Sequence, residues 1–173
     1  MKSLRLLVTK NYNRNCKLCC NKSFDLNNPK YIFKNNYSDY KEIILTGGEP
    51  LLYPIQLIKL IKKIRMACES PIFIYTAYSS NIDYLIRIII LSDGITFTIH
   101  EEKDIDFFYN LSEKIIENQL EYKSLRLNIF DNIRLKNTYV FWEIKNIKWL
   151  KNCPIPKNED FKVLNPGINK IQI

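Results

Sequence analysis

The sequence has little histidine and no long hydrophobic run, and each absence excludes a class of protein. His100 is the only histidine among the 173 residues, so a Cys2His2 zinc finger is excluded. The apolar stretch LIRIIIL, at 85–91, is far too short to span a bilayer, and the opening MKSLRLLVTK lacks the pattern of a signal peptide. We therefore expect a cytoplasmic protein with no membrane partner.

Blocks of like charge are also missing. The formal net charge is +8, but the lysines are scattered and no run of five or six occurs. Basic faces attract phosphates, so a nucleic-acid partner is possible. A diffusely basic, solvated surface explains the same composition, and we favour it over a dedicated nucleic-acid surface.

The cysteines lack the even spacing of a disulfide framework. The chain has five, an odd number, and Cys16, Cys19 and Cys20 lie within five positions. This pattern favours reduced thiols with metal or redox chemistry. A Cys-x2-Cys turn can aim two thiolates at one metal, and soft thiolates favour zinc or iron–sulfur sites. No second Cys-x2-Cys exists, which excludes a four-cysteine zinc site built from two such pairs.

Short apolar runs and amphipathic segments alternate along the chain. We expect strands over 4–9, 42–46, 72–76, 95–99, 125–130 and 139–145, and helices over 54–68, 79–91 and 104–121. Residues 152–173 are interrupted by proline and are expected to be mostly irregular. Alternating strands and helices indicate right-handed βαβ units. The sequence predicts one α/β domain, residues 1–173, built as a partial, open βα barrel of about six parallel strands with helices on its outer face.

Polar and glycine residues follow the second expected strand in the segment TGGEP. Gly47 and Gly48 let the backbone approach a ligand closely, Glu49 offers a carboxylate, and Pro50 makes the exit from the strand rigid. Such an arrangement suits an ammonium group. A plain strand-to-helix turn is the alternative interpretation.

Together, the cysteines and TGGEP resemble the radical S-adenosylmethionine (SAM) superfamily. The family pattern is Cys-x3-Cys-x2-Cys after the first strand and Gly-Gly-Glu-Pro after the second, and NRNCKLCCNK and ILTGGEPLL stand in that order here. The resemblance implies that thiolates of the loop hold a 4Fe–4S cluster and that SAM binds its open iron. Its ligands here would be Cys16 and Cys19, with Cys20 as a further candidate.

The resemblance also implies a reaction and its partners. An electron from an external one-electron donor cleaves SAM, and the resulting 5′-deoxyadenosyl radical abstracts hydrogen from a substrate. That substrate, a small molecule or a protein, stays unknown. The glycine-rich segment that begins at Thr46 would hold the amino group of SAM, and Leu18, just before the last motif cysteine, would pack on its adenine.

Tyr12 occupies the position where the family has its first cluster cysteine. A phenol, with a pKa of about 10, stays protonated at neutral pH and is a harder ligand than a thiolate. Cys20 replaces the missing thiol only in a contorted loop, because adjacent residues of an extended chain point to opposite sides. Cys68 suits the apolar face of its helix, and Cys153 suits a loop or packing role.

The departure at Tyr12 leaves three interpretations open. The chain is an active enzyme with an unusual cluster site, a degenerate, catalytically silent member that binds SAM or a partner without cleaving SAM, or an ordinary enzyme with a local inactivating change.

Five further residues follow or end expected strands and are candidates for the site. His100 suits acid–base chemistry or substrate contact, or a simple hydrogen bond within a loop. Thr76, Tyr78 and Ser80 would meet the ribose or carboxylate of SAM, although turn and cap roles explain them equally well. Asn128 would face the cavity at the strand ends, or pair with backbone.

Overall fold

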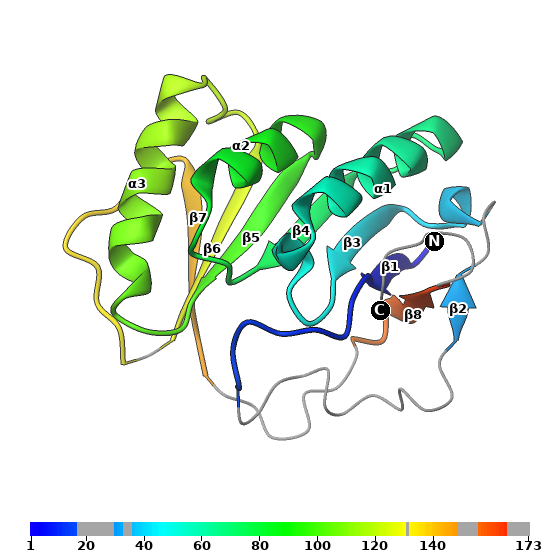
Figure 1. Ribbon diagram of the computed structural model, residues 1–173, viewed down its shortest axis with the longest axis horizontal. Helices are drawn as coiled ribbons and strands as arrows, with labels where there is room; N and C mark the ends of the chain where they lie inside the picture. Colours follow the sequence, from blue (N-terminus) through cyan, green and yellow to red (C-terminus); the bar gives the residue numbers. More distant parts are fainter. Residues whose placement is uncertain (17–29, 33–35, 131, 149–155, 166–173) are drawn as a thin grey trace.

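The computed structural model describes residues 1–16, 30–32, 36–130, 132–148 and 156–165 (Figure 1). In this part of the chain the strands form one sheet in the order β2-β8-β1-β3-β4-β5-β6-β7. Every neighbouring pair is parallel, and the sheet is open. The strands are β1 (Ser3–Leu7), β2 (Tyr31–Ile32), β3 (Glu42–Thr46), β4 (Ile72–Thr76), β5 (Gly94–Ile99), β6 (Ser124–Phe130), β7 (Trp142–Ile147) and β8 (Glu159–Leu164).

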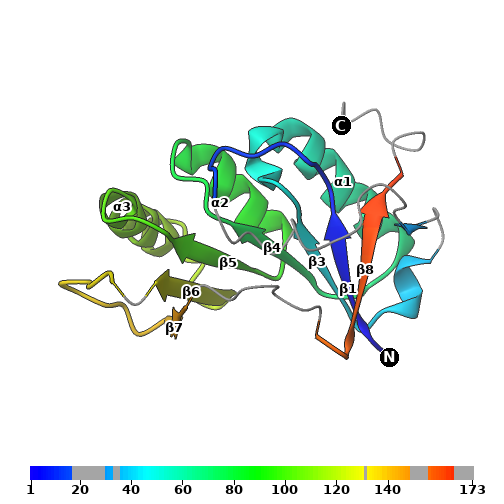
Figure 2. The same cartoon turned by 90° about the horizontal axis from the view of Figure 1, so that it is seen from below.

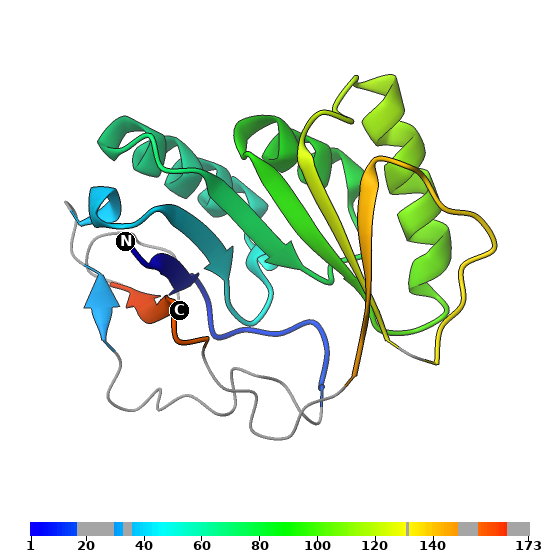
Figure 3. The same cartoon turned by 180° about the vertical axis from the view of Figure 1, so that it is seen from behind.

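The helices α1 (Pro54–Ala67), α2 (Ile82–Leu91) and α3 (Asp104–Glu117) lie on one face of the sheet (Figures 2 and 3). Their apolar stripes make this layer stable. In α1, Leu57, Ile61 and Ile64 are almost completely buried, in the positions that the amphipathic pattern predicts. None of the helices in the described ranges has the length and apolar character that crossing a bilayer requires.

Each predicted helix forms, and its ends follow local chemistry. The side chain of Asn81 accepts a hydrogen bond from the backbone N–H of Tyr84 at 3.1 Å and so caps α2. Pro54 occupies the first turn of α1, where its missing N–H costs nothing. Two short 3-10 helices, Tyr37–Asp39 and Pro50–Leu52, complete the described helical structure.

The expected count of about six strands is wrong, because the described residues form eight. All six expected strands are present, and β2 and β8 join them beyond β1. Strand β8 lies inside the segment 152–173, which was expected to be irregular. Its sequence, EDFKVL, has no clear alternation, but β8 pairs along β1 on one side and with β2 on the other. Pairing with a free strand edge outweighs weak local propensity here.

The sheet order places four loops next to one another. Strands β1, β3, β4 and β5 are consecutive neighbours and parallel, so their carboxyl ends lie along one edge of the sheet. The segments that leave these ends contain Cys16, Gly48, Ala77 and His100. Ligand sites of open α/β sheets form at such an edge.

Candidate functional site

A cavity of about 130 Å³ lies at this carboxyl edge. The described residues that line it are Tyr12, Asn13, Arg14, Cys16, Gly48, Glu49, Tyr75, Thr76, Ala77 and His100. A second hollow, of about 500 Å³, follows residues 10–16 and shares the segment 12–14 and Cys16 with the first. The cysteine loop, the glycine pair and the ends of β4 and β5 therefore meet in one place.

The backbone of the loop after β1 packs directly on Gly47 and Gly48. The N–H of Gly48 donates to the carbonyl of Thr9 at 2.7 Å, and the N–H of Glu49 donates to that of Asn11 at 2.8 Å. A Cβ atom on Gly48 would lie 1.8 Å from the carbonyl oxygen of Asn11, and one on Gly47 would lie 2.6 Å from that of Thr9. The glycines are thus required by the approach of the chain's own backbone, which brings the two motifs together.

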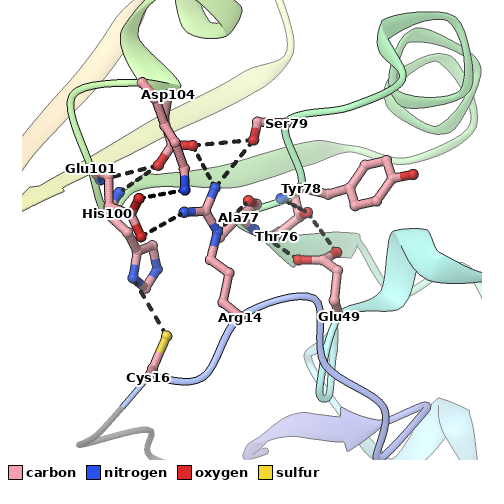
Figure 4. A network of polar contacts seen from close by, with 11 residues as sticks. Arg14, Cys16, Glu49, Thr76, Ala77, Tyr78, Ser79, His100, Glu101 and Asp104 are labelled. Atoms are coloured by element: carbon pink, nitrogen blue, oxygen red, sulfur yellow. Dashed lines mark hydrogen bonds and ion pairs between the residues drawn. The ribbon is translucent and has the colours of Figure 1, made fainter.

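The carboxylate of Glu49 is buried and points to the end of β4 (Figure 4). Its Oε1 accepts hydrogen bonds from the backbone N–H of Leu51 at 3.0 Å and from the hydroxyl of Thr76 at 2.7 Å. Its Oε2 accepts from the N–H of Ala77 at 3.0 Å. Glu49 therefore joins the loop after β3 to the loop after β4.

Burial raises the pKa of Glu49 above its usual value. The hydrogen bonds from Leu51, Ala77 and Thr76, and the charge of Arg14, oppose that shift without cancelling it. A cation that binds beside Glu49 would favour its ionised form.

Arg14 anchors the cysteine loop to the neighbouring strand ends (Figure 4). Its Nε donates to the carbonyl of Ala77 at 3.2 Å, and its Nη2 donates to Ser79 Oγ at 3.1 Å and to Asp104 Oδ1. Its Nη1 lies 3.6 Å from a carboxylate oxygen of Glu101. Because the Arg14 side chain is only 13% exposed, these contacts are shielded from water.

Asp104, the first residue of α3, is the fully buried centre of the same network. Its Oδ2 accepts from the backbone N–H groups of His100 and Glu101, each at 3.1 Å, and its Oδ1 accepts from Ser79 Oγ at 3.1 Å. Burial favours the neutral acid. The hydrogen bond and charge of Arg14, together with the two amides, outweigh that effect and hold the pKa of Asp104 below its usual value.

Cys16 and His100 face each other across the cavity. Cys16 Sγ lies 3.7 Å from His100 Nδ1. Burial, reinforced by the charge of Arg14, lowers the pKa of His100 to about 4, although Asp104 and Glu101 act in the opposite direction. At neutral pH the imidazole is therefore neutral and can act as an acceptor or a metal ligand.

The structure assembles only some of the candidate residues. Cys16, Gly48, Glu49, Thr76 and His100 line the cavity, and Gly47 supports it. Leu18, Cys19 and Cys20 lie outside the described residues, as does Cys153. Thr76 donates to Glu49 and accepts from the N–H of Tyr78, so the structure gives it a structural role.

The remaining candidates are not among the described residues that line the cavity. Thr46 and Pro50 are buried in the turn that leads to Glu49. The ring of Tyr78 points away from the Arg14 guanidinium (Figure 4), and Ser80 is exposed. Asn128 is half-buried on β6, opposite Thr98 of β5.

Arg14 and Asp104 are the functional-site residues that sequence reasoning missed. They are 90 residues apart, and neither belongs to a motif that predicts their contact. An acidic residue in the first turn of a helix is a common local signal, and Asp104 carries it. No comparable local signal marks Arg14.

No three histidine, cysteine, aspartate or glutamate side chains gather into a metal-binding group within the described ranges. Of the three expected metal-binding thiols, Cys16 is the one that these ranges include. No protein-family model, curated protein or solved structure matches the chain. A function is therefore inferred from its own residues.

Proposed function

We propose that the chain is a radical SAM-type protein, which binds an iron–sulfur cluster and SAM and generates a 5′-deoxyadenosyl radical. One observation carries this proposal. Cys16, from the loop after β1, and Gly48 and Glu49, from the loop after β3, line the same cavity at the carboxyl edge of the sheet. These are the two motifs on which the resemblance depends, and the open parallel sheet with helices on one face suits a partial βα barrel.

The donor set suits an iron–sulfur cluster. Cys16 lines the cavity with its sulfur directed at His100 (Figure 4), and the sequence continues with Cys19 and Cys20, which would be further thiolate donors. When bound, a reduced 4Fe–4S cluster supplies the electron that cleaves SAM into methionine and the radical. The chain's own contribution is to hold residues 9–16 against the neighbouring strand ends, through Arg14 and through the backbone bonds of Thr9 and Asn11.

Glu49 is suited to bind the amino group of SAM. A carboxylate offers about four acceptor positions, and described residues occupy three of those of Glu49. We expect an ammonium ligand to take the fourth. Burial raises the pKa of this carboxyl and so favours its neutral form. A bound ammonium group would form a charge-assisted hydrogen bond with the carboxylate and would restore the ionised form. Leu18 would pack on the adenine.

A second candidate is a degenerate protein of the same type that binds SAM or a partner without cleaving SAM. Tyr12 favours it. The phenol lines the cavity where the resemblance places a cluster thiolate, and its side chain is 42% exposed. A neutral phenol does not supply the missing ligand at neutral pH.

The test compares the natural chain with Tyr12→Cys. Both are purified without oxygen and reconstituted with iron and sulfide. Iron and sulfide are then counted per chain, the reduced cluster is detected by electron paramagnetic resonance, and release of 5′-deoxyadenosine from SAM is measured. Tyr122→Cys is the matched control, because Tyr122 is 77% exposed and outside the cavity.

Cleavage of SAM by the natural chain would establish the enzyme. Cleavage by Tyr12→Cys alone would establish the silent alternative. If neither chain holds about four irons while Tyr122→Cys behaves like the natural chain, the cluster proposal is wrong.

A further inference from the structure

The thiol of Cys16 and the imidazole of His100 form a close pair from two distant parts of the chain. Their donor atoms, Sγ and Nδ1, are 3.7 Å apart, and the residues are 84 positions apart in the sequence (Figure 4). Cys16 belongs to the loop after β1, and His100 follows β5. Both line the cavity at the carboxyl edge.

Each partner is held in place by the same buried network. The backbone N–H of His100 donates to Asp104 Oδ2 at 3.1 Å, and the His100 ring packs against that of Phe130 with centroids 5.1 Å apart. Arg14, two residues before Cys16, binds the other oxygen of Asp104. One carboxylate thus binds the backbone of His100 and the side chain of Arg14, and so holds the two chain segments that carry the donors next to each other.

The separation of the two donors matches a shared metal atom. Bonds of about 2.3 Å to thiolate sulfur and about 2.0–2.1 Å to imidazole nitrogen, at a tetrahedral angle, put the donors about 3.6 Å apart. The observed distance is 3.7 Å. Donors on two different irons of a cluster would be farther apart, because bridging sulfides separate the irons.

The local charge also permits a cation. The guanidinium of Arg14 is the nearest positive group on this network, and the carboxylates of Asp104 and Glu101 lie against it. Lys103 Nζ lies 2.5 Å from the other oxygen of Glu101, so the two carboxylates balance two cations, and a thiolate at Cys16 adds a negative charge. A divalent ion between Cys16 and His100 therefore does not meet an uncompensated positive field.

We propose that Cys16 Sγ and His100 Nδ1 bind the same atom of a thiophilic transition metal, either a single divalent ion such as Zn²⁺ or Fe²⁺ or an iron of a two-iron cluster, where two bridging sulfides leave two positions for protein ligands. Zinc sites of the Cys2His2 and Cys3His types combine thiolate and imidazole on one metal, and in Rieske centres two imidazoles replace two thiolates on one iron, so both donors are chemically sound. The inference rests on the proposed function only in taking Cys16 as a metal ligand. It adds His100 as a ligand in place of an acid–base role, and two positions of a tetrahedron stay available to water or other ligands.

The test exploits the single histidine of the chain. Untagged protein is labelled with ¹⁵N-histidine, so that His100 gives the only labelled ring. In one arm the metal-free, reduced protein is titrated with ¹¹³Cd²⁺ and then with Zn²⁺, and the ring nitrogens are followed by NMR. In the other arm the protein is reconstituted with iron and sulfide, reduced, and examined by pulsed electron paramagnetic resonance.

We expect Nδ1 to couple to ¹¹³Cd in the first arm or to the electron spin of iron in the second, and the responding arm identifies the source of the metal atom. We also expect His100→Ala and Cys16→Ser each to weaken Cd²⁺ binding at least about tenfold in the single-ion case. Cys68→Ser is the matched control, because Cys68 is a half-buried thiol at the C-cap of α1, packed against the core, and should leave both signals unchanged.

The two proposals fail separately. Absence of nitrogen coupling in both arms, from protein that binds metal through Cys16, would overturn the assignment of His100 and leave SAM cleavage untouched. The coupling measurement needs no substitution, so a variant that fails to fold does not compromise it. Coupling without any SAM cleavage would instead support His100 as a ligand and count against the proposed enzyme.

Discussion

The guanidinium of Arg14 and the carboxylate of Asp104 form an ion pair that joins the cysteine loop to the first turn of α3. Asp104 is fully buried and Arg14 is 13% exposed, so both charges have exchanged water for each other and for protein donors. Removing one partner of such a pair leaves the other charge buried and uncompensated. The stability of the site therefore depends on this contact.

Asp104→Asn should lower the free energy of unfolding by about 3 kcal/mol, because Arg14 would lose its buried counter-charge. Asp106→Asn is the matched control: Asp106 also lies in the first turn of α3, but it is exposed. Urea denaturation of the natural chain and both variants measures the difference. Equal midpoints for the two variants would show that the buried pair does not hold the loop.

Gly48→Ala should destabilise the chain by about 1–3 kcal/mol, because the new methyl group would overlap the backbone of Asn11. Gly47→Ala should also destabilise the chain, because its Cβ would lie 2.6 Å from Thr9 O and its φ of +158° is one that L side chains rarely adopt. Limited proteolysis within residues 10–16, together with denaturation, reports whether the loop has detached. Unchanged stability of Gly48→Ala would contradict this packing.

Two buried threonines on adjacent strands should respond to valine in opposite directions. Thr76 on β4 donates to Glu49 and accepts from Tyr78, so Thr76→Val should cost about 1–3 kcal/mol. Thr96 Oγ1 on β5 is buried without a hydrogen-bond partner among the described residues, so Thr96→Val should raise stability by about 1 kcal/mol. Thermal unfolding of both variants checks the signs, and destabilisation by Thr96→Val would refute the second.

The metal-free chain should lose stability in acid through His100. Its pKa is lowered to about 4, whereas a free histidine has a pKa of about 6.5, so the unfolded state binds the extra proton between these values. The contribution is fully present above pH 6.5 and falls by about 2 kcal/mol as the pH approaches 4, allowing for the partial exposure of the ring.

His100→Gln is the control for that prediction, because glutamine does not titrate. Glu49 acts in the opposite direction: its raised pKa makes the fold less stable as the pH rises through it. Only the difference between the natural chain and His100→Gln isolates the histidine. If the free energy of unfolding changed equally for the natural chain and for His100→Gln between pH 7 and pH 4, His100 would already be charged or exposed in the folded state.

Local signals were sufficient to predict most of the fold. The runs at 42–46 and 72–76 match β3 and β4 to the residue, because apolar, β-branched segments are bounded there by turn residues. Strand β8 lacked such a signal, because the segment EDFKVL is extended through its pairing with the edge of β1. Burial of its last residues, Val163 and Leu164, emerges only when the sheet is assembled.

The candidate site was predictable only where the chain carries a motif. The convergence of Cys16 with Gly48 and Glu49 follows from the parallel strand order. The role of the glycines was harder to predict from the sequence, because they pack against the backbone of residues 9–11, and no local pattern reveals that contact. The Arg14–Asp104 pair likewise joins residues that meet only in the folded chain.

The position of β8 has a consequence for biosynthesis. Strand β1 takes its second partner from residues 159–164, whereas β3 and β4 leave the ribosome much earlier. Until residues 159–164 are synthesised, one side of β1 carries unpaired backbone N–H and C=O groups, which readily pair with a strand from another molecule. We expect nascent chains of this protein to need a chaperone over that edge, and chains truncated before residue 159 to aggregate.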